Sequence, residues 1–227
     1  QASINAAQGA SVMQVGDGGL ARISDVLQRM KSLAAASLSG VPTDTERGFI
    51  NAEYAQLLAE IDGVAASTRF NGESLLDGTG AQFGAGTVNF FVGVTTADVI
   101  AVDISTLSAT ASNFLAASLA TGGTALGSTN VSTSAGASTA MGSIDLAINE
   151  ISEARANLGS IVSRFEFRQQ QVATSKENID AALSSVVDVD LAAEQARLVS
   201  SQVLVQASVS ALSQANQLPQ TLLSLLQ

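Results

Sequence analysis

The feature that most constrains the fold is a hydrophobic repeat between residues 144 and 186. Its positions alternate by four and three residues, and a period of 3.5 keeps one stripe of a helix facing a neighbouring helix. The repeat lasts about six heptads, so it predicts one long helix with a coiled-coil seam that needs partner helices. The apolar positions of this seam are Ile144, Ile148, Ile151, Leu158, Val162, Phe165, Val172, Ile179, Leu183 and Val186, and its polar positions are Arg155, Gln169 and Lys176.

Two segments near the start of the chain can supply those partners. Residues 1–35 are expected to be helical, because Ile23, Leu27, Met30 and Ala34 recur on one helical face. Residues 39–45 form a breaker, and Thr45 is the expected cap of a second helix. That helix carries one apolar face at spacings of four and three, and the two helices should pack antiparallel. Its face consists of Ile50, Tyr54, Leu57, Ile61 and Val64.

The middle of the chain changes from helical to β-like composition. The dipeptide at residues 71–72, Asn-Gly, is a turn signal, and the β-branched runs 88–94 and 99–104 predict a hairpin. Residues 108–140 are rich in Ala, Ser, Thr and Gly and almost free of charge. We expect a loosely ordered connection there, with one short helix around 111–120.

The last segment is apolar on more than one helical face. Asp188 and Asp190 should break the preceding helix and cap the next one, and Pro219 should end or kink it. A large exposed apolar surface usually marks an interaction site, so this tail is expected to be buried against other chains; the alternative is an ordinary core helix of a globular domain. The residues expected to make those contacts are Leu198, Val203, Val209, Leu212, Leu222 and Leu225.

These patterns together predict a fold class and a division of the chain. The fold is mainly α, with long antiparallel helices in a coiled-coil-like bundle and a small β-hairpin region. The expected segments are 1–107, 108–140, 141–187 and 188–227. With 46% hydrophobic but only 4% aromatic residues, the chain suits helices that pack through small and aliphatic side chains.

Composition also excludes several functions. The chain has no Cys and no His, which removes thiolate catalysis, Ser-His-Asp chemistry and zinc-protease sites. A net charge of −10 disfavours binding to nucleic acids and to anionic membranes. We therefore predict no catalytic, metal or cofactor-binding residues, no enzyme activity, no nucleic-acid partner and no membrane insertion.

Four short motifs resemble those of one family. Residues 28–34 (Gln-Arg-Met-Lys-Ser-Leu-Ala) resemble the N-terminal helix of bacterial flagellins. Residues 60–62 and 68–72 resemble the flagellin junction between helix and hairpin, and 158–160 with 163–165 resemble its C-terminal coiled-coil helix. Residues 211–220 and 225–227 are similar to the flagellin terminus. The four matches occur in family order across 1–108 and 140–227, which makes the resemblance specific.

The resemblance implies a structural subunit that self-assembles into the flagellar filament outside the cell. It implies a core domain made from 1–107 and 141–187, a short hypervariable connection at 108–140, and a terminal helix at 188–227 that lines the inner tube of the filament. A partner terminal helix would precede Gln1, so this chain alone is expected to stay monomeric while the restored chain polymerises. The implied partners are other flagellin subunits, the export chaperone, and the flagellar cap and junction proteins, with secretion through the flagellar export apparatus.

The resemblance also implies one possible contact with a host receptor. Gln28, Arg29, Leu33 and Glu53 match positions at which related flagellins contact the Toll-like flagellin receptor. Ser32 departs from the acid that the family usually has there. The simpler interpretation is that these residues form a solvated surface that contacts the neighbouring subunit in the filament. We favour this interpretation for the role for which the protein was selected in evolution.

Two other classes of function compete with the filament subunit. One is a flagellin-like surface protein or adhesin that binds a glycan or a host receptor, which would need clustered aromatic side chains; Phe90 and Phe91 are the only adjacent pair. The other is the hook–filament junction protein, which shares the terminal helices. The match at 211–227 favours flagellin over the junction protein.

Overall fold

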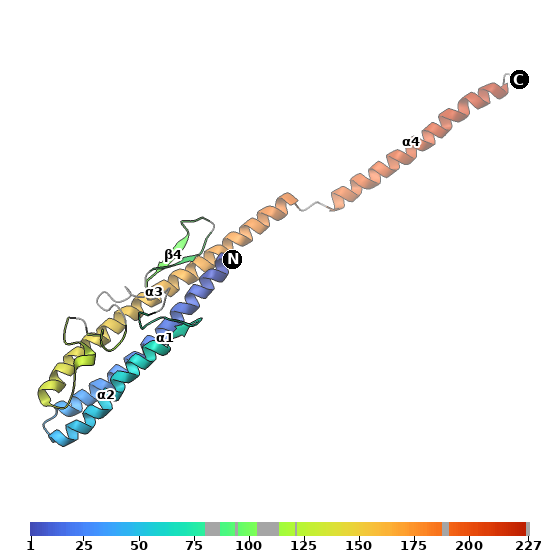
Figure 1. Ribbon diagram of the computed structural model, residues 1–227. Coiled ribbons are helices and arrows are strands. Elements are labelled where there is room, and N and C mark those ends of the chain that lie inside the picture. Colours follow the sequence, from blue (N-terminus) through green and yellow to red (C-terminus); the bar gives the residue numbers. More distant parts are fainter. Residues whose placement is uncertain (80–86, 94, 104–113, 121, 188–190, 226–227) are drawn as a thin grey trace. The chain divides into compact units, whose positions relative to one another are not determined.

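The computed structural model describes residues 1–79, 87–93, 95–103, 114–120, 122–187 and 191–225 (Figure 1). The chain divides into two units, 1–174 and 175–227, which we describe separately. The described residues form four long α-helices and two small antiparallel sheets of two strands each. The predicted fold class, mainly α with a small β-hairpin region, is therefore confirmed.

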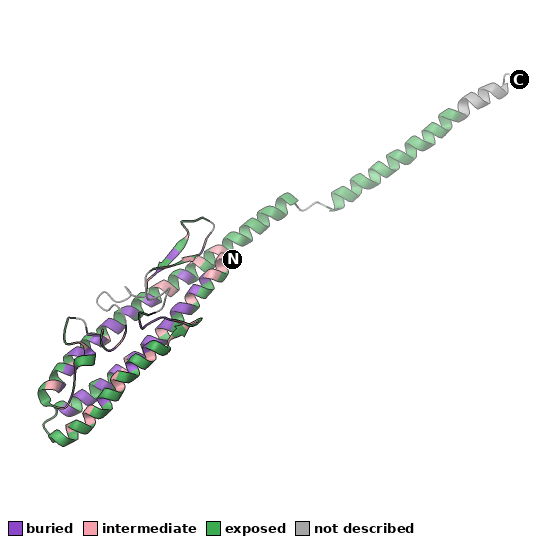
Figure 2. Cartoon of the chain, in the orientation of Figure 1, coloured by how far each residue is buried: buried purple, intermediate pink, exposed green. Residues whose placement is uncertain are grey.

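Helix α1 (Ala2–Leu38) is the central element of the first unit. It pairs antiparallel with α2 (Asp44–Ser67) and contacts α3 (Ser134–Val187) through its opposite edge. Because α1 has two neighbours, its buried face is wide, whereas α2 buries only Tyr54, Ile61 and Ala65 fully. Figure 2 colours the buried residues along the helices of the first unit, and those of α1 include Val12, Met13, Leu20, Ile23, Leu27, Met30 and Ala34.

The start of α2 differs from the prediction. Its N-cap is Thr43, not Thr45: the Thr43 hydroxyl accepts a hydrogen bond from the Glu46 amide, and the Glu46 carboxylate accepts one from the Thr43 amide. This reciprocal capping box satisfies two amides that the first helical turn leaves without partners. The two hydrogen bonds from Thr43 also hold the pKa of Glu46 below its ordinary value.

Two hairpins follow α2. Asn71 and Gly72 have φ of 51° and 85°, the left-handed conformation that a two-residue hairpin turn requires, and they join β1 (Arg69–Phe70) to β2 (Glu73–Ser74). The predicted second hairpin is formed by β3 (Val88–Phe91) and β4 (Val99–Val102), paired antiparallel. Residues 94 and 104, at the ends of the predicted strands, lie outside the described residues.

The connection between β4 and α3 is better packed than predicted. Residues 114–120 and 122–133, which we call the return segment, bury Phe114, Leu119, Leu126 and Val131 in the core. They contain a 3-10 turn (Leu126–Ser128) but no α-helix; the rest of the helix predicted around 111–120 lies outside the described residues.

Polar side chains of the helices hold the return segment by its backbone. Asp62 and Glu150 accept hydrogen bonds from the amides of Ala116 and Ala120, and Asn51 accepts one from Val131. These acceptors satisfy amides that would otherwise be buried without partners. The long helix α3 begins at Ser134, seven residues before the predicted segment 141–187.

Within the first unit, the seam of α3 has the predicted period but a partly different register. Ile144, Ile151, Leu158 and Phe165 are buried as predicted. The positions between them are not all as predicted: Ala147 and Ala154 are buried, and Ile148 and Val162 are partly buried. Arg155, predicted in a core position, is instead exposed, because its guanidinium reaches across to Asp17 on α1.

The second unit contains the end of α3 and helix α4 (Leu191–Leu225). Every side chain described in this unit is exposed. Asp188 and Asp190, the predicted break and cap, lie outside the described residues. Helix α4 continues past Pro219, so this proline does not end the helix, although a proline removes one hydrogen bond from a helix interior.

Candidate assembly surfaces

The seam of α3 is exposed in its last third. Ile179 and Leu183 are 65% and 57% exposed, and Val186 is more exposed still. They continue the spacing of the buried positions further up the helix, so a partner helix could cover them without a change of period. The sequence pattern is the same along α3, and only the presence of a neighbour within the chain differs.

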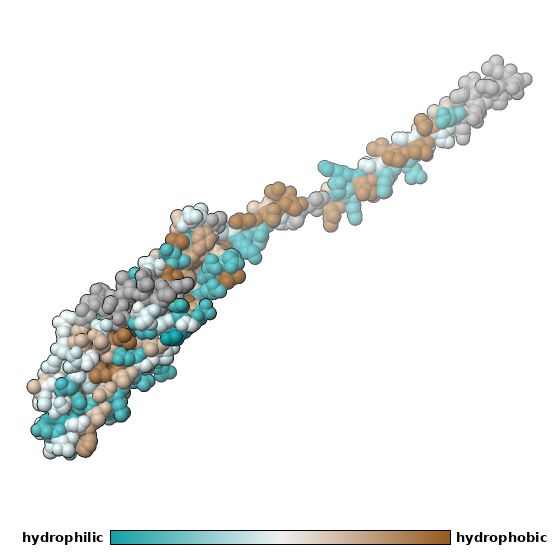
Figure 3. All heavy atoms as spheres, viewed as in Figure 1, coloured by the Kyte–Doolittle hydropathy of each residue, from teal (hydrophilic) through white to brown (hydrophobic). Residues whose placement is uncertain are grey.

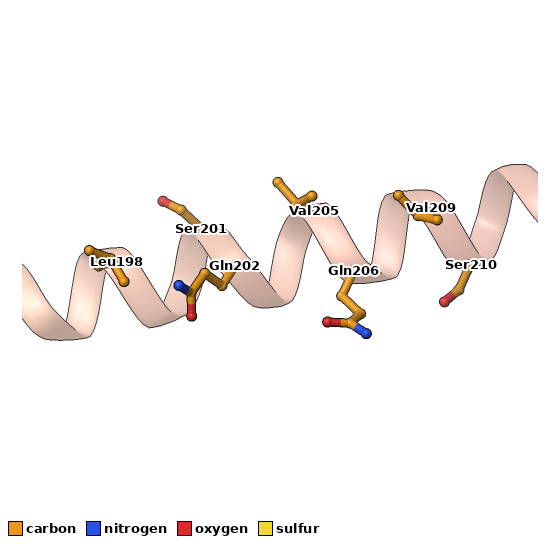
Figure 4. A pocket seen from close by; sticks show the side chains of 7 residues that line it. All are labelled: Leu198, Ser201, Gln202, Val205, Gln206, Val209 and Ser210. Carbon is orange, nitrogen blue, oxygen red and sulfur yellow. The ribbon is translucent and has the colours of Figure 1, made fainter.

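A second exposed apolar surface runs along α4. Its side chains recur at steps of seven, seven, four and three residues, which places them on one face of the helix. In Figure 4, Val205 and Val209 point to one side of the helix, whereas Gln202 and Gln206 point to the other. Figure 3 shows apolar and polar residues alternating along this helix. We call this surface the α4 stripe; it consists of Leu191, Leu198, Val205, Val209 and Leu212.

The predicted contact residues of the tail divide between two faces of α4. Leu198, Val209 and Leu212 belong to the α4 stripe, whereas Val203 lies with Val199 on a different face. Both faces are exposed, which agrees with the prediction that the tail is apolar on more than one side. Leu222 and Leu225 lie outside the residues whose side chains are described.

Charge does not oppose the burial of this helix. From Leu198 to the end of the chain there is no Asp, Glu, Lys or Arg. A neighbouring chain could therefore cover the α4 stripe without removing a charge from water, which is the most costly part of burying a surface. Within the described part of the chain, no helix combines the length and the apolar character needed to cross a membrane.

The hollow beside the α4 stripe is not a ligand pocket. All seven side chains that line it come from consecutive turns of one helix, as Figure 4 shows. Small-molecule sites are concave and cover most of their ligand, and a single helix provides no opposing wall. In the described ranges, no cluster of three or more acidic side chains could hold a metal ion. The arrangement suits the packing of another helix.

Partly exposed ion pairs join the helices of the first unit. Arg155 donates to Asp17 at 2.8 Å, which joins α3 to α1, and Lys31 contacts Asp145 between the same two helices. The hydrogen bond to Asp17 raises the pKa of Arg155 above its ordinary value. The sequence periodicity gave no sign of these pairs, because their partners are more than a hundred residues apart.

The residues expected to contact a receptor are only partly accessible. Gln28, Arg29 and Glu53 are exposed, and Arg29 forms an ion pair with Glu53 between α1 and α2 (N–O distance 2.6 Å). Leu33 is only 7% exposed because it packs into the core. The structure thus brings Arg29 and Glu53 together and leaves Leu33 little surface for a partner.

Sequence analysis missed two exposed aromatic residues. Phe49 on α2 is 73% exposed and Phe167 on α3 is 69% exposed. Each lies outside the periodic apolar positions of its helix: Phe49 precedes Ile50, and Phe167 follows Phe165. An aromatic residue outside the register was the signal that could have found both.

Long helices with one packed and one uncovered region define a protein built to assemble with other chains. Residues 1–81 match the bacterial flagellin N-terminal helical region, and residues 141–226 match the bacterial flagellin C-terminal helical region. The flagellin of Halalkalibacterium halodurans is 33% identical over 226 residues, an alignment that covers 100% of this chain and 78% of that protein. The flagellar filament 33 kDa core protein of Treponema phagedenis is 36% identical over 234 residues, covering 100% and 79%.

A solved structure agrees with these sequence matches. The crystal structure of Bacillus cereus flagellin superposes with a TM-score of 0.59 at 29% identity, covering 79% of this chain and 94% of that one. The chain belongs to the bacterial flagellin family. It is a structural subunit of the extracellular flagellar filament that assembles with other flagellin subunits, and the comparisons do not favour an adhesin or a junction protein.

Proposed function

We propose that this subunit enters the filament by burying the α4 stripe and the exposed end of the α3 seam against neighbouring subunits. The observation that carries the proposal is the exposure of Leu198, Val209 and Leu212 on α4 and of Ile179 and Leu183 at the end of α3. Burial of one such side chain contributes about 1.5–3 kcal/mol. Burial of several of them on each subunit would favour polymerisation.

Before assembly, the same surface needs protection from aggregation. We propose that the export chaperone covers the tail around Leu198, Val203, Val209 and Leu212 until the flagellar export apparatus secretes the subunit. Long exposed apolar helices are typical of segments that order against a partner. The cap and junction proteins would then meet the same helices at the two ends of the filament.

We further propose that recognition by a Toll-like flagellin receptor is incidental to this role. The candidate surface is the exposed Arg29–Glu53 pair with Gln28. The same exposed ion pair could instead contact the next subunit of the filament, and we favour this role.

The proposed burial of the α4 stripe can be tested by polymerisation of the native protein and its variants. The double variant L198A/L212A keeps helix-forming residues but removes apolar area, so we expect it to raise the critical concentration for polymerisation at least about tenfold. Seeded assembly followed by negative-stain microscopy and sedimentation measures this concentration.

The matched control is L198M/L212M, which keeps the apolar area and should polymerise nearly like the parent protein. Thermal unfolding of the monomer should be similar for both variants, because the two leucines are exposed. Normal polymerisation of L198A/L212A would show that the α4 stripe is not an assembly contact.

A further inference from the structure

The part of the return segment that leads into α3 contains an exposed asparagine in a specific sequence context. Asn130 is followed by Val131 and Ser132. This is the pattern Asn-X-Ser, with X other than proline, that transferases of N-linked sugars recognise. So short a pattern also arises by chance, and its structural setting decides whether it can carry a sugar. The amide nitrogen must reach water, and the sugar must not displace packed side chains.

The middle residue of the pattern is anchored in the core, and its two neighbours are not. Val131 is fully buried, and its amide donates to the side-chain oxygen of Asn51 on α2 at 2.9 Å. Its carbonyl accepts a hydrogen bond from the hydroxyl of Ser37 on α1. On either side of Val131, Asn130 is exposed and Ser132 is half-buried. The anchored valine therefore holds the asparagine and the serine at the surface in one fixed arrangement.

The two polar atoms of the Asn130 carboxamide have different surroundings. The Ser132 hydroxyl donates to Oδ1 at 2.9 Å. A Cβ atom at Gly136, in the first turn of α3, would lie 2.9 Å from the same Oδ1, so this oxygen faces the start of the helix. Within the described residues, Nδ2 donates no hydrogen bond. Because Oδ1 and Nδ2 project from the same carbon in different directions, the nitrogen is the atom left facing water.

The chain around Asn130 leaves room for a sugar. The residues that follow the pattern, 133–135, are small and exposed. From residue 104 to residue 144 the sequence has no Asp, Glu, Lys or Arg, so neither a neutral nor an acidic sugar meets a like charge along this stretch. Asn130 belongs neither to the α4 stripe nor to the exposed end of the α3 seam. A modification there would leave the residues of both surfaces unaltered.

We propose that Asn130 is a site of N-linked glycosylation. The donor is a sugar whose anomeric carbon carries a pyrophosphate leaving group. Nδ2 forms a bond to that carbon, the bond from the carbon to the pyrophosphate oxygen breaks, and its electron pair leaves with the pyrophosphate. Nδ2 loses one proton to a base of the transferase. In the product Oδ1 still accepts the hydrogen bond from Ser132, so the local structure of the segment is kept.

The fold restricts when the sugar can be added. A transferase that reads Asn-X-Ser needs access to all three residues, whereas the folded unit buries Val131 and occupies both of its backbone polar groups. The sugar is therefore added before the first unit folds around Val131. The folded unit then keeps it at the surface, because Asn130 is exposed.

Tandem mass spectrometry of filaments from the native cells tests the modification. We expect the peptide that contains Asn130 to carry an added sugar mass, and fragmentation that preserves glycosidic bonds to place this mass on Asn130. The variant N130D lacks the amide nitrogen but keeps an oxygen for Ser132 to contact, and S132A lacks the hydroxyl that the pattern requires. Expressed in the same cells, both should lose the sugar completely. The matched control is S132T, which restores a hydroxyl and should keep the sugar.

The same variants define the results that would overturn the site. An unmodified Asn130 in filaments of the parent protein would contradict it directly. A sugar that persists in N130D would be attached to a hydroxyl, such as that of Ser132, and would replace N-linked by O-linked modification. Monomer unfolding is the control for folding, and we expect N130D to unfold like the parent, because an acid just before a helix N-terminus is tolerated. Since filament formation is not the measurement, either result leaves the proposed function as it stands.

Discussion

The two parts of α3 carry the same hydrophobic repeat but have opposite environments. Around Ile144 and Leu158 the repeat is buried against α1, whereas around Ile179 and Leu183 it is exposed. The contrast in Figure 2 between the first unit and the exposed second unit follows from this difference. The comparison teaches that a heptad repeat predicts a surface that must be covered, but not whether the same chain or another one covers it.

The prediction with the largest expected effect compares two residues of the α3 seam, one buried and one exposed. Phe165 is fully buried, and its ring packs against that of Phe90 in a T-shaped arrangement at a centroid distance of 5.3 Å. We expect F165A to lower the free energy of unfolding of the monomer by about 3–5 kcal/mol, because it leaves a cavity. The same measurement on I179A should change by less than about 0.5 kcal/mol, because this side chain is mostly exposed.

In filament formation, unlike in monomer unfolding, we expect the substitution of Ile179 to have a clear effect. The variant I179A should raise the critical concentration for filament formation while its monomer unfolds like the parent, as followed by circular dichroism. If I179A destabilised the monomer as strongly as F165A, the end of the seam would already be covered within one chain, and the contrast would be false.

Two glycines of α1 provide a smaller test of packing. A Cβ atom at Gly9 would lie 2.5 Å from the Phe165 ring, which cannot move away because it is buried against Phe90. We expect G9A to destabilise the monomer by about 1–3 kcal/mol through overpacking. At Gly18 nothing lies within 4 Å, so the matched variant G18A should stabilise it by up to about 1 kcal/mol through helix propensity.

Opposite signs for the two glycines are the expected result in chemical denaturation of the monomer. Equal effects would mean that α1 and α3 do not approach closely at Gly9. The packed half of the seam would then be looser than the burial of its residues indicates.

The sequence predicted the elements that depend on local periodicity and turn chemistry. The long helices, the β3–β4 hairpin and the turn at Asn71 follow from spacing and from residue type alone. The true cap of α2 also had a local signal, since Thr43 precedes Glu46 by three residues as in a capping box, but Thr45 was preferred.

The sequence could not predict what depends on distant partners. The return segment looks unstructured by composition, yet acceptors such as Asp62 and Glu150 hold its backbone in place. Arg155 fits the heptad register but leaves the core because Asp17, far away in sequence, offers a better environment for a charge. The apolar tail was predicted as a surface for other chains, whereas the whole seam of α3 was expected to be covered by the two helices at the start of the chain, so the exposure of Ile179 and Leu183 was not predicted.

The smallest expected effect concerns acid. Burial raises the pKa of Asp77, but the hydrogen bonds from the amide and hydroxyl of Thr79 and the nearby charge of Arg69 are among the interactions that together outweigh it, so the pKa lies below its ordinary value. A lowered pKa in the folded state contributes stability above the unfolded pKa of about 4, and this stability is lost as pH falls through the folded value. When the pH is lowered from about 5 to about 3, we therefore expect the melting temperature of the parent monomer to fall more than that of D77N.

Acid should distinguish the packed unit from the uncovered helix. Beyond Arg197, α4 has no ionisable side chain, so acid leaves the α4 stripe chemically unchanged while it weakens the first unit. The matched control is D180N, which removes a carboxylate from the exposed part of α3, outside the packed unit. Identical pH dependence of D77N and the parent would show that Asp77 gains nothing from its Thr79 hydrogen bonds, and that acid acts on the packed unit through its other carboxylates.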